Sequence, residues 1–364
     1  MSFKDTKVVI VGAGKVGSTT AFSIMNQGLC GDVCLIDVNH EHAVGEALDM
    51  RDSVFFMNRN VNVHAGDYSE CADADIVIVT AAAPMPKDSN DRLEMLKPSL
   101  GVVRSVVEQV MASGFDGIFL VVSNPVDVMA YYTWKVSGLP HERVIGSGTF
   151  LDSARLCRAL SDMYDLASNS VEAFVLGEHG DSEIVSWNSA TIGGKRVDDV
   201  LRDNASRTRG VTRDELRKRT VQAGWDIFSR KGNTCYGIAS STASIAKSIL
   251  FDENRIMPVS VYLDGQYGIR DTFISVPTIV DGTGAKEIVE ITGLVKEHHI
   301  PVIFTEYNGS DATAKAISRE TGCQVAQLSM IMDGEDDRLE SYVNAQINNM
   351  KAVCGGFAKE AAAQ

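Results

Sequence analysis

The feature that most constrains this chain is a glycine pattern directly after its first apolar run. Residues 7–11 (KVVIV) are short, β-branched and apolar on both faces, as in a buried parallel strand. Residues 12–17 then read GAGKVG and lead into an apolar stretch with helical spacing. Because a strand that turns through glycines into a helix is the first unit of a parallel sheet, a sheet covered by helices is predicted.

Each glycine of this pattern suits the binding of a dinucleotide. Gly12 allows the tight turn, Gly14 lets the backbone approach a pyrophosphate, and Gly17 lets helix and strand pack closely. The start of the helix offers free N–H groups and the positive end of its dipole to the phosphates. Asp37 ends the next strand, where it would accept hydrogen bonds from the adenosine ribose and repel a 2′-phosphate. The pattern therefore favours NAD over NADP; a glycine turn without a ligand is the alternative.

The rest of the N-terminal part continues the alternation of strands and helices. Strands are expected over 33–38, 76–80 and 117–122, with a helix over 100–111 between the last two. This alternation predicts an α/β fold, a doubly wound parallel sheet over residues 1–145.

The pattern changes after residue 145 and again after residue 291. Residues 146–291 predict a second, mixed α+β domain, and residues 292–364 a small α/β tail. In the second domain we expect helices over 152–166, 212–223 and 238–249, a strand pair around 171–176 and 193–200, and a β-rich stretch over 257–280. In the tail we expect strands near 300–305 and 325–332 and helices near 294–299, 311–321 and 340–351.

Composition excludes several classes of function. The net charge of the 364 residues is −14, which disfavours nucleic acid and anionic membrane surfaces as partners. The seven cysteines are odd in number and form no CxxC, so reduced thiols are expected rather than a disulfide scaffold. The sequence shows no secretion signal and no apolar run of about 18 residues. We therefore expect a cytoplasmic protein with no nucleic-acid or membrane partner.

Three further motifs carry chemically active groups: SNPVD at 123–127, LDSARL at 151–156 and GEHGD at 177–181. Each has an ordinary structural explanation when taken alone. His179 could be a buried histidine with satisfied hydrogen bonds, Asp152 a helix N-cap, Arg155 a surface ion-pair partner and Asn124 part of a turn. In this order behind a dinucleotide pattern, however, the three motifs are specific.

Through these motifs, residues 5–291 resemble the lactate/malate dehydrogenase family, and its L-lactate branch most closely. The stretches ERVIGSGT, GEHGDSE, YGIA and SVPTIVDGTGAKEIVEI carry the likeness. The resemblance implies a Rossmann domain, an α+β substrate domain and a homodimer or homotetramer. It also implies hydride transfer between NADH and pyruvate, as in glycolysis and pyruvate fermentation. The expected cofactor-binding residues are Gly12, Gly14, Lys15, Val16, Gly17, Asp37, Thr80, Ala81, Ala82 and Asn124.

The resemblance implies a role for each motif residue, and elementary chemistry supports these roles. His179 is expected to exchange a proton with the substrate oxygen, because imidazole titrates near neutral pH. Asp152 is expected to hold the other ring N–H, and Arg155 to bind the substrate carboxylate through two parallel hydrogen bonds. Arg92 matches an arginine of a mobile loop that polarises the carbonyl. The expected substrate-binding residues are Arg155, Asn124, Arg92, Thr234 and Met85.

The loop at 80–92, TAAAPMPKDSNDR, bears on which 2-oxo acid is used. Met85 falls where lactate enzymes of the family carry glutamine and malate enzymes arginine. Residues 81–86 contain no Arg or Lys, so a second substrate carboxylate would lack a charge partner, which argues against malate. An apolar Met85 could instead admit larger 2-oxo acids, so a broader 2-hydroxyisocaproate-type dehydrogenase is the alternative to L-lactate dehydrogenase; simple loop packing is the plain explanation.

The tail departs from the family, which continues into one long helix after KEIVEI. Its segment IPVIFTE, followed by AKAISRETG, resembles the C-terminal lobe of zinc- or manganese-binding solute-binding proteins of ABC transporters. Glu306 matches a carboxylate that can ligate metal there, but the histidine ligands of the other lobe are absent, and one carboxylate does not make a zinc site. We therefore expect no metal site. A non-catalytic nucleotide- or metal-binding fusion protein remains the alternative of another class.

Overall fold

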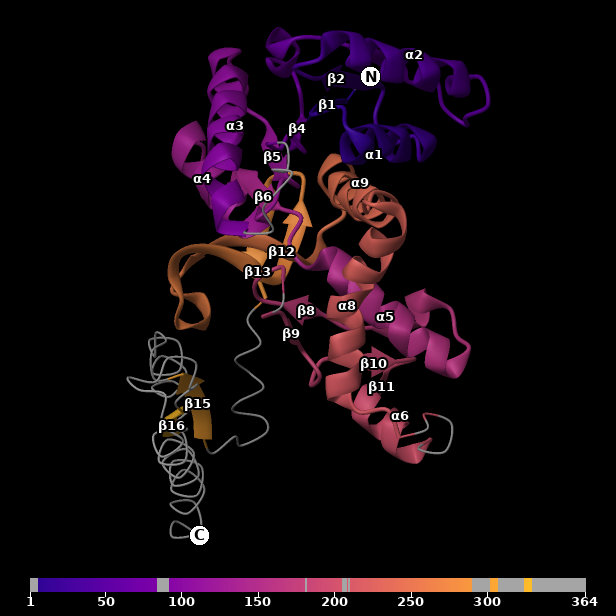
Figure 1. Ribbon diagram of the computed structural model, residues 1–364, viewed down its shortest axis with the longest axis vertical. Coiled ribbons are helices and arrows are strands. Elements are labelled where there is room, and N and C mark those ends of the chain that lie inside the picture. The colour runs from indigo at the N-terminus through magenta and orange to yellow at the C-terminus, as the bar shows by residue number, and fades with distance from the viewer. Residues whose placement is uncertain are drawn as a thin grey trace. The chain divides into compact units, whose positions relative to one another are not determined.

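The computed structural model describes residues 6–83, 92–180, 182–204, 208 and 210–289, together with the two strands Val302–Glu306 and Gln324–Leu328. The chain divides into two compact units (Figure 1). The first comprises Met1–Tyr262 and Thr272–Val289, and the second Leu263–Asp271 and Glu290–Gln364.

A nine-stranded sheet organises the first unit. Its strand order is β14-β13-β12-β6-β5-β4-β1-β2-β3, and the segment from β6 to β3 is parallel throughout. The six parallel strands have the spatial order 3-2-1-4-5-6 of a doubly wound dinucleotide-binding sheet, which confirms the predicted fold class. Their bounds are β1 Lys7–Val11, β2 Asp32–Ile36, β3 Asn62–Ala65, β4 Ile76–Val79, β5 Ile118–Val121 and β6 Val144–Gly146.

Helices cover both faces of this sheet. Helix α1 packs beside α9, while α3 packs beside α4 (Figure 1). The helices are α1 Lys15–Asn26, α2 His40–Val54, α3 Arg92–Ala112, α4 Val126–Ser137, α5 Phe150–Tyr164, α6 Val197–Asp203, α8 Arg213–Lys231 and α9 Tyr236–Leu250. None of the helices in the described part of the chain is long and apolar enough to cross a membrane.

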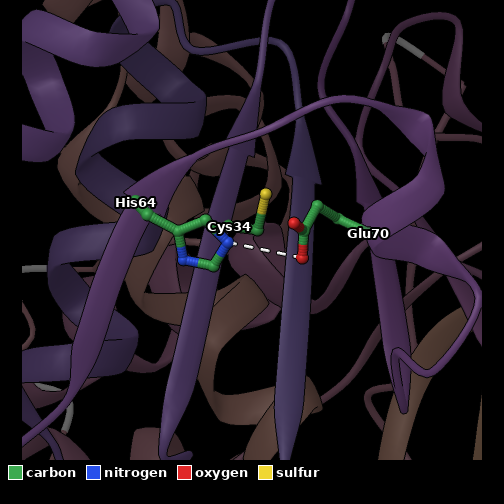
Figure 2. Close-up of side chains that lie close together, drawn as sticks. All are labelled: Cys34, His64 and Glu70. Atoms are coloured by element: carbon green, nitrogen blue, oxygen red, sulfur yellow. Dashed lines mark ion pairs between the residues drawn. The ribbon is translucent and has the colours of Figure 1, made fainter.

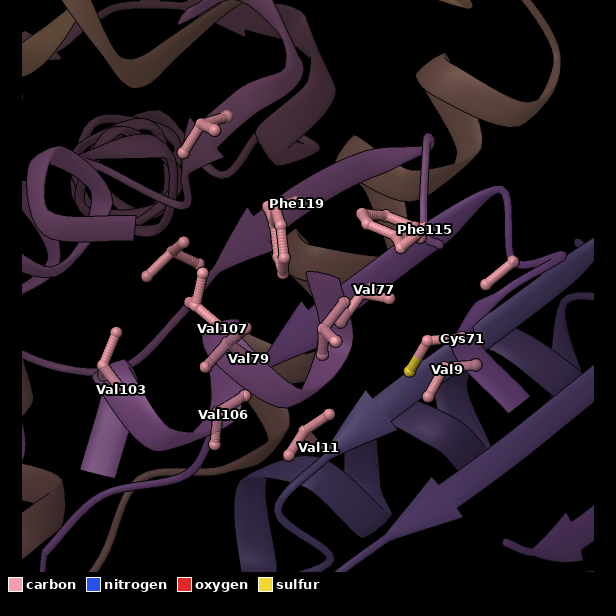
Figure 3. Packing of buried hydrophobic residues seen from close by; sticks show 14 of the residues in the cluster. Val9, Val11, Cys71, Val77, Val79, Val103, Val106, Val107, Phe115 and Phe119 are labelled. Atoms are coloured by element: carbon pink, nitrogen blue, oxygen red, sulfur yellow. The ribbon is translucent and has the colours of Figure 1, made fainter. Parts of the chain in front are cut away.

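The core under α3 follows from the two-residue period of the strands. Alternate residues of β1 and β4, such as Val9 and Val77, point to one face of the sheet and are fully buried. They pack against a valine stripe on α3 that includes Val103 and Val107, and against Phe119 of β5 (Figure 3). Burying each such side chain contributes about 1.5–3 kcal/mol. This core therefore holds the strands, and the loops at their ends, in place.

The second half of the first unit differs from expectation in two places. Residues 171–176 form two short strands in separate sheets, β7 Val171–Glu172 and β8 Val175–Leu176, because residues 173–174 between them belong to neither strand. Residues 193–200 are expected to form one strand, but only Lys195–Arg196 is extended (β11), and the helix α6 begins at Val197. Asp198 and Asp199 occupy the first turn of α6, where negative charge is favoured by the helix dipole. The remaining strands are β9 Ile184–Val185, β10 Thr191–Ile192, β12 Arg255–Asp264, β13 Arg270–Asp281 and β14 Gly284–Ile288.

The second unit contains the two strands expected in the tail. β15, Val302–Glu306, pairs with β16, Gln324–Leu328, in parallel register. A parallel pair needs a crossover connection rather than a hairpin, which accords with the long separation of the two strands. The helices expected near 294–299, 311–321 and 340–351 lie outside the described residues.

Candidate active site

The glycine loop between β1 and α1 is built by close backbone contacts. Gly12 has a φ of +105°, which side chains rarely tolerate. A Cβ at Gly17 would lie 1.8 Å from the carbonyl oxygen of Gly12, so only glycine fits there. The Thr80 hydroxyl donates a hydrogen bond to that carbonyl at 2.7 Å, which ties the end of β4 to the loop. The loop therefore has the tight conformation that its sequence predicts.

The mouth of this loop is open. Within the described residues, a Cβ at Gly14 would meet nothing within 4 Å, and no side chain caps the N-terminus of α1. Lys15 is exposed and Val16 half-buried in its first turn. The open glycine and the uncapped helix end together fit a pyrophosphate, which needs close backbone approach and free N–H donors.

Asp37 lies beside the glycine loop and is hydrogen-bonded to it. Its carboxylate accepts hydrogen bonds from the backbone N–H of Ala13, at 2.7 Å, and of Asn39, at 2.9 Å. These bonds fix its position directly after β2, at the carboxyl end of the sheet where a ribose would lie. Ala81 and Ala82 follow Thr80 at the same edge, and the Ala81 carbonyl accepts a hydrogen bond from Ser123. The residues present fit an NAD cofactor.

His179 and Asp152 form a short hydrogen bond. The Nδ1 atom of His179 lies 2.6 Å from Oδ2 of Asp152, whose side chain is 2% exposed. Burial raises the pKa of Asp152, but the hydrogen bond and charge of His179, with the charge of Arg155, outweigh it and leave the pKa below its ordinary value. Burial lowers the pKa of His179, but the hydrogen bond and charge of Asp152 outweigh that effect and raise it. The pair thus favours an imidazolium beside a carboxylate.

Helix α5 brings Arg155 to the same carboxylate. Asp152 lies in the first turn of α5 behind the N-cap residue Thr149, and Arg155 follows three residues later on the same face. The Nη1 atom of Arg155 donates to Oδ1 of Asp152 at 2.8 Å. A Cβ at Gly224 of α8 would come within 3.4 Å of the guanidinium, so this glycine leaves room for it.

Two acidic groups at this site were not singled out from the sequence. Asp127 accepts hydrogen bonds from the Ser260 hydroxyl, at 2.5 Å, and from the backbone N–H of His179, at 3.3 Å. It therefore anchors the histidine loop to α4. Glu183 lies within 4.8 Å of Asp152 and His179 and is 2% exposed. Both lie inside quoted motifs, SNPVD and GEHGDSE, and their charge was the available signal.

Glu183 is unusual in its environment. Burial, and then the charge of Asp152, raise its pKa to about 7. Among the described residues, its Oε1 atom has no hydrogen-bond partner. The group Asp152, His179 and Glu183 could in principle hold a metal ion, but the short bond between His179 and Asp152 already uses one ligand atom of each.

Two of the remaining predicted site residues lie in loops between named elements. Asn124 is exposed directly after β5, ahead of α4, and Thr234 is half-buried between α8 and α9. Within the described part of the chain, neither is hydrogen-bonded to His179, Asp152 or Arg155. Arg92 begins α3, but its side chain and all of Met85 lie outside the described residues, as does the side chain of Glu306.

Family models match most of the chain. Residues 6–146 match the NAD binding domain of lactate/malate dehydrogenase, and residues 149–299 match its alpha/beta C-terminal domain. A further match, described as zinc-uptake complex component A, periplasmic, covers residues 257–354 and overlaps the second.

Individual relatives agree. L-lactate dehydrogenase 3 of Bacillus cereus is 49% identical over 285 residues, which cover 78% of this chain and 90% of the relative. L-lactate dehydrogenase 1 of Bifidobacterium longum is 48% identical over 311 residues, 84% of this chain and 98% of the relative. The solved structure of a ligand-bound minor L-lactate dehydrogenase from Enterococcus mundtii is 39% identical with a TM-score of 0.76, covering 87% of this chain and 97% of that one. This chain therefore belongs to the lactate/malate dehydrogenase family.

Proposed function

We propose that this protein is an NAD-dependent L-lactate dehydrogenase, which interconverts pyruvate and L-lactate in glycolysis and pyruvate fermentation. The observation that carries the proposal is the His179–Asp152 pair with Arg155 beside it, in the same unit as an open glycine loop. Relatives named L-lactate dehydrogenase, at 48–49% identity, support the substrate.

The reaction needs a proton on the substrate oxygen and a fixed substrate carboxylate. When bound, the nicotinamide cofactor would supply the hydride chemistry: as NADH for the reduction of pyruvate, and as NAD for the oxidation of L-lactate. Because Asp152 bonds Nδ1 of His179, the Nε2 atom is left to give its proton to the oxygen of pyruvate, or to take it from L-lactate. The carboxylate of Asp152 stabilises the imidazolium that pyruvate reduction requires.

Arg155 is proposed to bind the substrate carboxylate. Its guanidinium donates one N–H to Asp152, and the side chain is only 12% exposed, so it is held in place before the substrate arrives. A planar guanidinium can then offer two parallel N–H donors to a carboxylate. Asn124 and Thr234 are proposed to contact the substrate, and Arg92 to polarise its carbonyl.

Substrate size is proposed to depend on Met85. No positive charge occurs at residues 81–86, so a dicarboxylate such as oxaloacetate would bring an unpaired charge into the site. An apolar side chain at position 85 favours either pyruvate or a larger apolar 2-oxo acid, and the second candidate function is therefore a 2-hydroxyisocaproate-type dehydrogenase.

The protein is further proposed to act in the cytoplasm as a homodimer or homotetramer. Support for the oligomer comes from apolar side chains at the end of α2, where Phe55 and Phe56 are 88% and 84% exposed. Neighbouring aromatic side chains that are both exposed are typical of a surface that a partner covers.

The test is NADH consumption with pyruvate, oxaloacetate and 2-oxoisocaproate supplied in parallel to the purified full-length chain. Turnover is expected to be fastest with pyruvate. A preference for 2-oxoisocaproate would keep the mechanism and select the second candidate. No turnover with any of the three, in a folded protein that binds NADH, would overturn the proposal in favour of a binding protein.

A further inference from the structure

A second cluster of metal-ligating side chains lies in the dinucleotide-binding domain, away from the residues assigned to catalysis. Cys34 of β2, His64 of β3 and Glu70 of the short 3-10 helix η1 (Tyr68–Cys71) converge with ligand atoms within 4.8 Å of one another. Figure 2 shows the imidazole ring and the carboxylate facing each other, with the thiol of Cys34 between them. We propose that these three side chains bind a divalent cation of borderline softness, with Zn²⁺ as the best match.

The ligand set suits this ion. Thiolate, imidazole and carboxylate are the three side-chain ligands of Zn²⁺ in proteins, and three of them plus water complete a tetrahedral site. With bonds of about 2.0–2.3 Å, neighbouring ligand atoms lie about 3.3–3.8 Å apart. The Nε2 atom of His64 already lies 3.4 Å from Oε2 of Glu70. Because the thiol lies within 4.8 Å of both other ligand atoms, a shift of about 1 Å brings it to this spacing.

The outer side of the histidine ring is held in the manner of a metal ligand. The Nδ1 atom of His64 lies 3.3 Å from Oδ1 of Asp32 and 3.4 Å from the side-chain amide of Asn62, which itself donates to Asp32. The Nε2 atom is left facing Glu70, at 3.4 Å. A carboxylate on the far nitrogen of a ligating histidine fixes its orientation and raises its basicity. Asp32 is therefore a positioning residue for this site.

A glycine makes the approach of the ligands possible. A Cβ at Gly66 would lie 2.6 Å from Cγ of Glu70 and 2.7 Å from Sγ of Cys34. Any other residue would push these two ligands apart. The absence of a side chain at position 66 leaves the space into which both point.

Charge also balances at this place. A dication bound to one thiolate, one carboxylate and one neutral imidazole gives a neutral centre, and the thiol proton is released to solvent on binding. Lys7 donates to Oε2 of Glu70 at 2.7 Å and to Oδ1 of Asp73 at 2.8 Å, so it can keep the second partner when the ion takes the first. Cys34 is fully buried while His64 is 27% exposed, which leaves an entry path on the histidine side.

The test is titration of the EDTA-treated full-length chain with Co²⁺ alone and with Zn²⁺ alone. Co²⁺ is expected to give a thiolate-to-metal charge-transfer band, together with visible bands of tetrahedral intensity, which Zn²⁺ then abolishes. The Asp152, His179 and Glu183 group contains no thiol and cannot produce the charge-transfer band.

Variants identify the ligands. In Cys34→Ser the charge-transfer band is expected to disappear, whereas Cys30→Ser, the matched control at another fully buried thiol, is expected to retain it. Asp32→Asn is expected to keep the band and weaken Co²⁺ affinity about 10- to 100-fold. If Cys34→Ser does not fold, His64→Gln at a partly exposed position replaces it, with His141→Gln as its control.

Two results would overturn the proposal: no charge-transfer band in the wild type, or a band of unchanged intensity in Cys34→Ser. An Asp32→Asn affinity equal to that of the wild type would remove the positioning role of Asp32. Circular dichroism and NADH binding check that each variant is folded, and neither readout depends on turnover.

Discussion

The clusters around His179 and His64 each contain two carboxylates and a basic side chain bonded to one of them, yet the two clusters suit different chemistry. His179 makes one short bond, from Nδ1 to Asp152 at 2.6 Å, and among the described residues its Nε2 has no hydrogen-bond partner. His64 faces an acid on each side, with Asp32 at 3.3 Å from Nδ1 and Glu70 at 3.4 Å from Nε2. A ring with one free nitrogen can exchange a proton, whereas a ring held at both nitrogens suits a fixed ligand.

Burial separates the clusters as well. The carboxylate of Asp152 is 2% exposed, whereas those of Asp32 and Glu70 are 26% and 33% exposed. An ion pair in the less polar interior is stronger, and breaking it leaves an unpaired buried charge. Equivalent substitutions in the two clusters should therefore have unequal effects.

The largest expected contrast is between the two histidines. His179→Gln removes the proton donor and is expected to lower kcat/KM for pyruvate by about 10⁴-fold, the upper range for general acid–base catalysis. His64→Gln, measured without added metal, is expected to stay within about twofold of the wild type because it lies outside the proposed reaction path. Steady-state kinetics of both variants decide this; comparable losses would break the comparison.

The aspartates give the next contrast. In Asp152→Asn the hydrogen bond and charge that raise the pKa of His179 are lost, so this pKa falls. Pyruvate reduction needs the imidazolium and is lost as pH rises through that pKa, so the alkaline limb of the pH–rate profile should move to lower pH. We expect a loss of about 10²- to 10⁴-fold at neutral pH.

Asp32→Asn is the matched control, and its pH–rate profile should coincide with that of the wild type. A shift of the alkaline limb in Asp32→Asn, or none in Asp152→Asn, would contradict the assignment of the proton donor to His179.

How far the sequence predicts these two regions depends on how each is encoded. The glycine loop is written in consecutive residues, since Gly12, Gly14 and Gly17 set the local backbone geometry that distant residues such as Thr80 and Asp37 then hold in place. The nine-stranded sheet extends the predicted pattern, because apolar runs such as 76–79 reveal buried parallel strands directly.

The second cluster is not visible in the sequence. Cys34, His64 and Glu70 come from three separate elements and share no ligand spacing. The register of β2 with β3 pairs Cys34 with His64, and η1 then brings Glu70 to them. Glu183 was missed for a related reason: its motif is visible, but its burial depends on packing. Likewise, the strand expected over 193–200 gave way to α6, whose N-terminal acids favour a helix start.

Substitutions of Glu183 and Glu70 test the difference in burial, because pH should change the stability of the two variants in opposite directions. The pKa of Glu183 is raised from 4.5 to about 7, so the folded protein binds this proton more tightly than the unfolded chain. Its contribution to stability is present at acid pH and is lost as pH rises through about 7. Glu183→Gln removes the cost of ionising this buried side chain. The free energy of unfolding of the variant, relative to that of the wild type, should therefore rise between about pH 5 and about pH 8, by up to about 3 kcal/mol.

Glu70→Gln should show the opposite dependence. The hydrogen bond from Lys7 keeps the pKa of Glu70 below its ordinary value. The contribution of ionised Glu70 to stability is present above the ordinary carboxyl pKa, and it is lost as pH falls through the lower pKa of the folded state. Urea unfolding of both variants across pH measures this, and the loss for Glu70→Gln should not exceed about 1 kcal/mol at neutral pH, because its side chain is 33% exposed. Equal signs in the two variants would contradict the comparison.

The basic residues give the smallest contrast, and it concerns shape rather than charge. Arg155→Lys keeps the positive charge beside Asp152 but replaces a planar fork with a point charge, so two parallel bonds to the substrate carboxylate can no longer form. Losing one charged hydrogen bond of this kind corresponds to about 10- to 100-fold in kcat/KM, expressed mainly in KM. Lys7 meets two separate carboxylates, Glu70 and Asp73, where only charge matters, so Lys7→Arg should leave both kinetic parameters unchanged. A wild-type KM in Arg155→Lys would mean that this arginine supplies charge alone, and the two clusters would then differ only in burial.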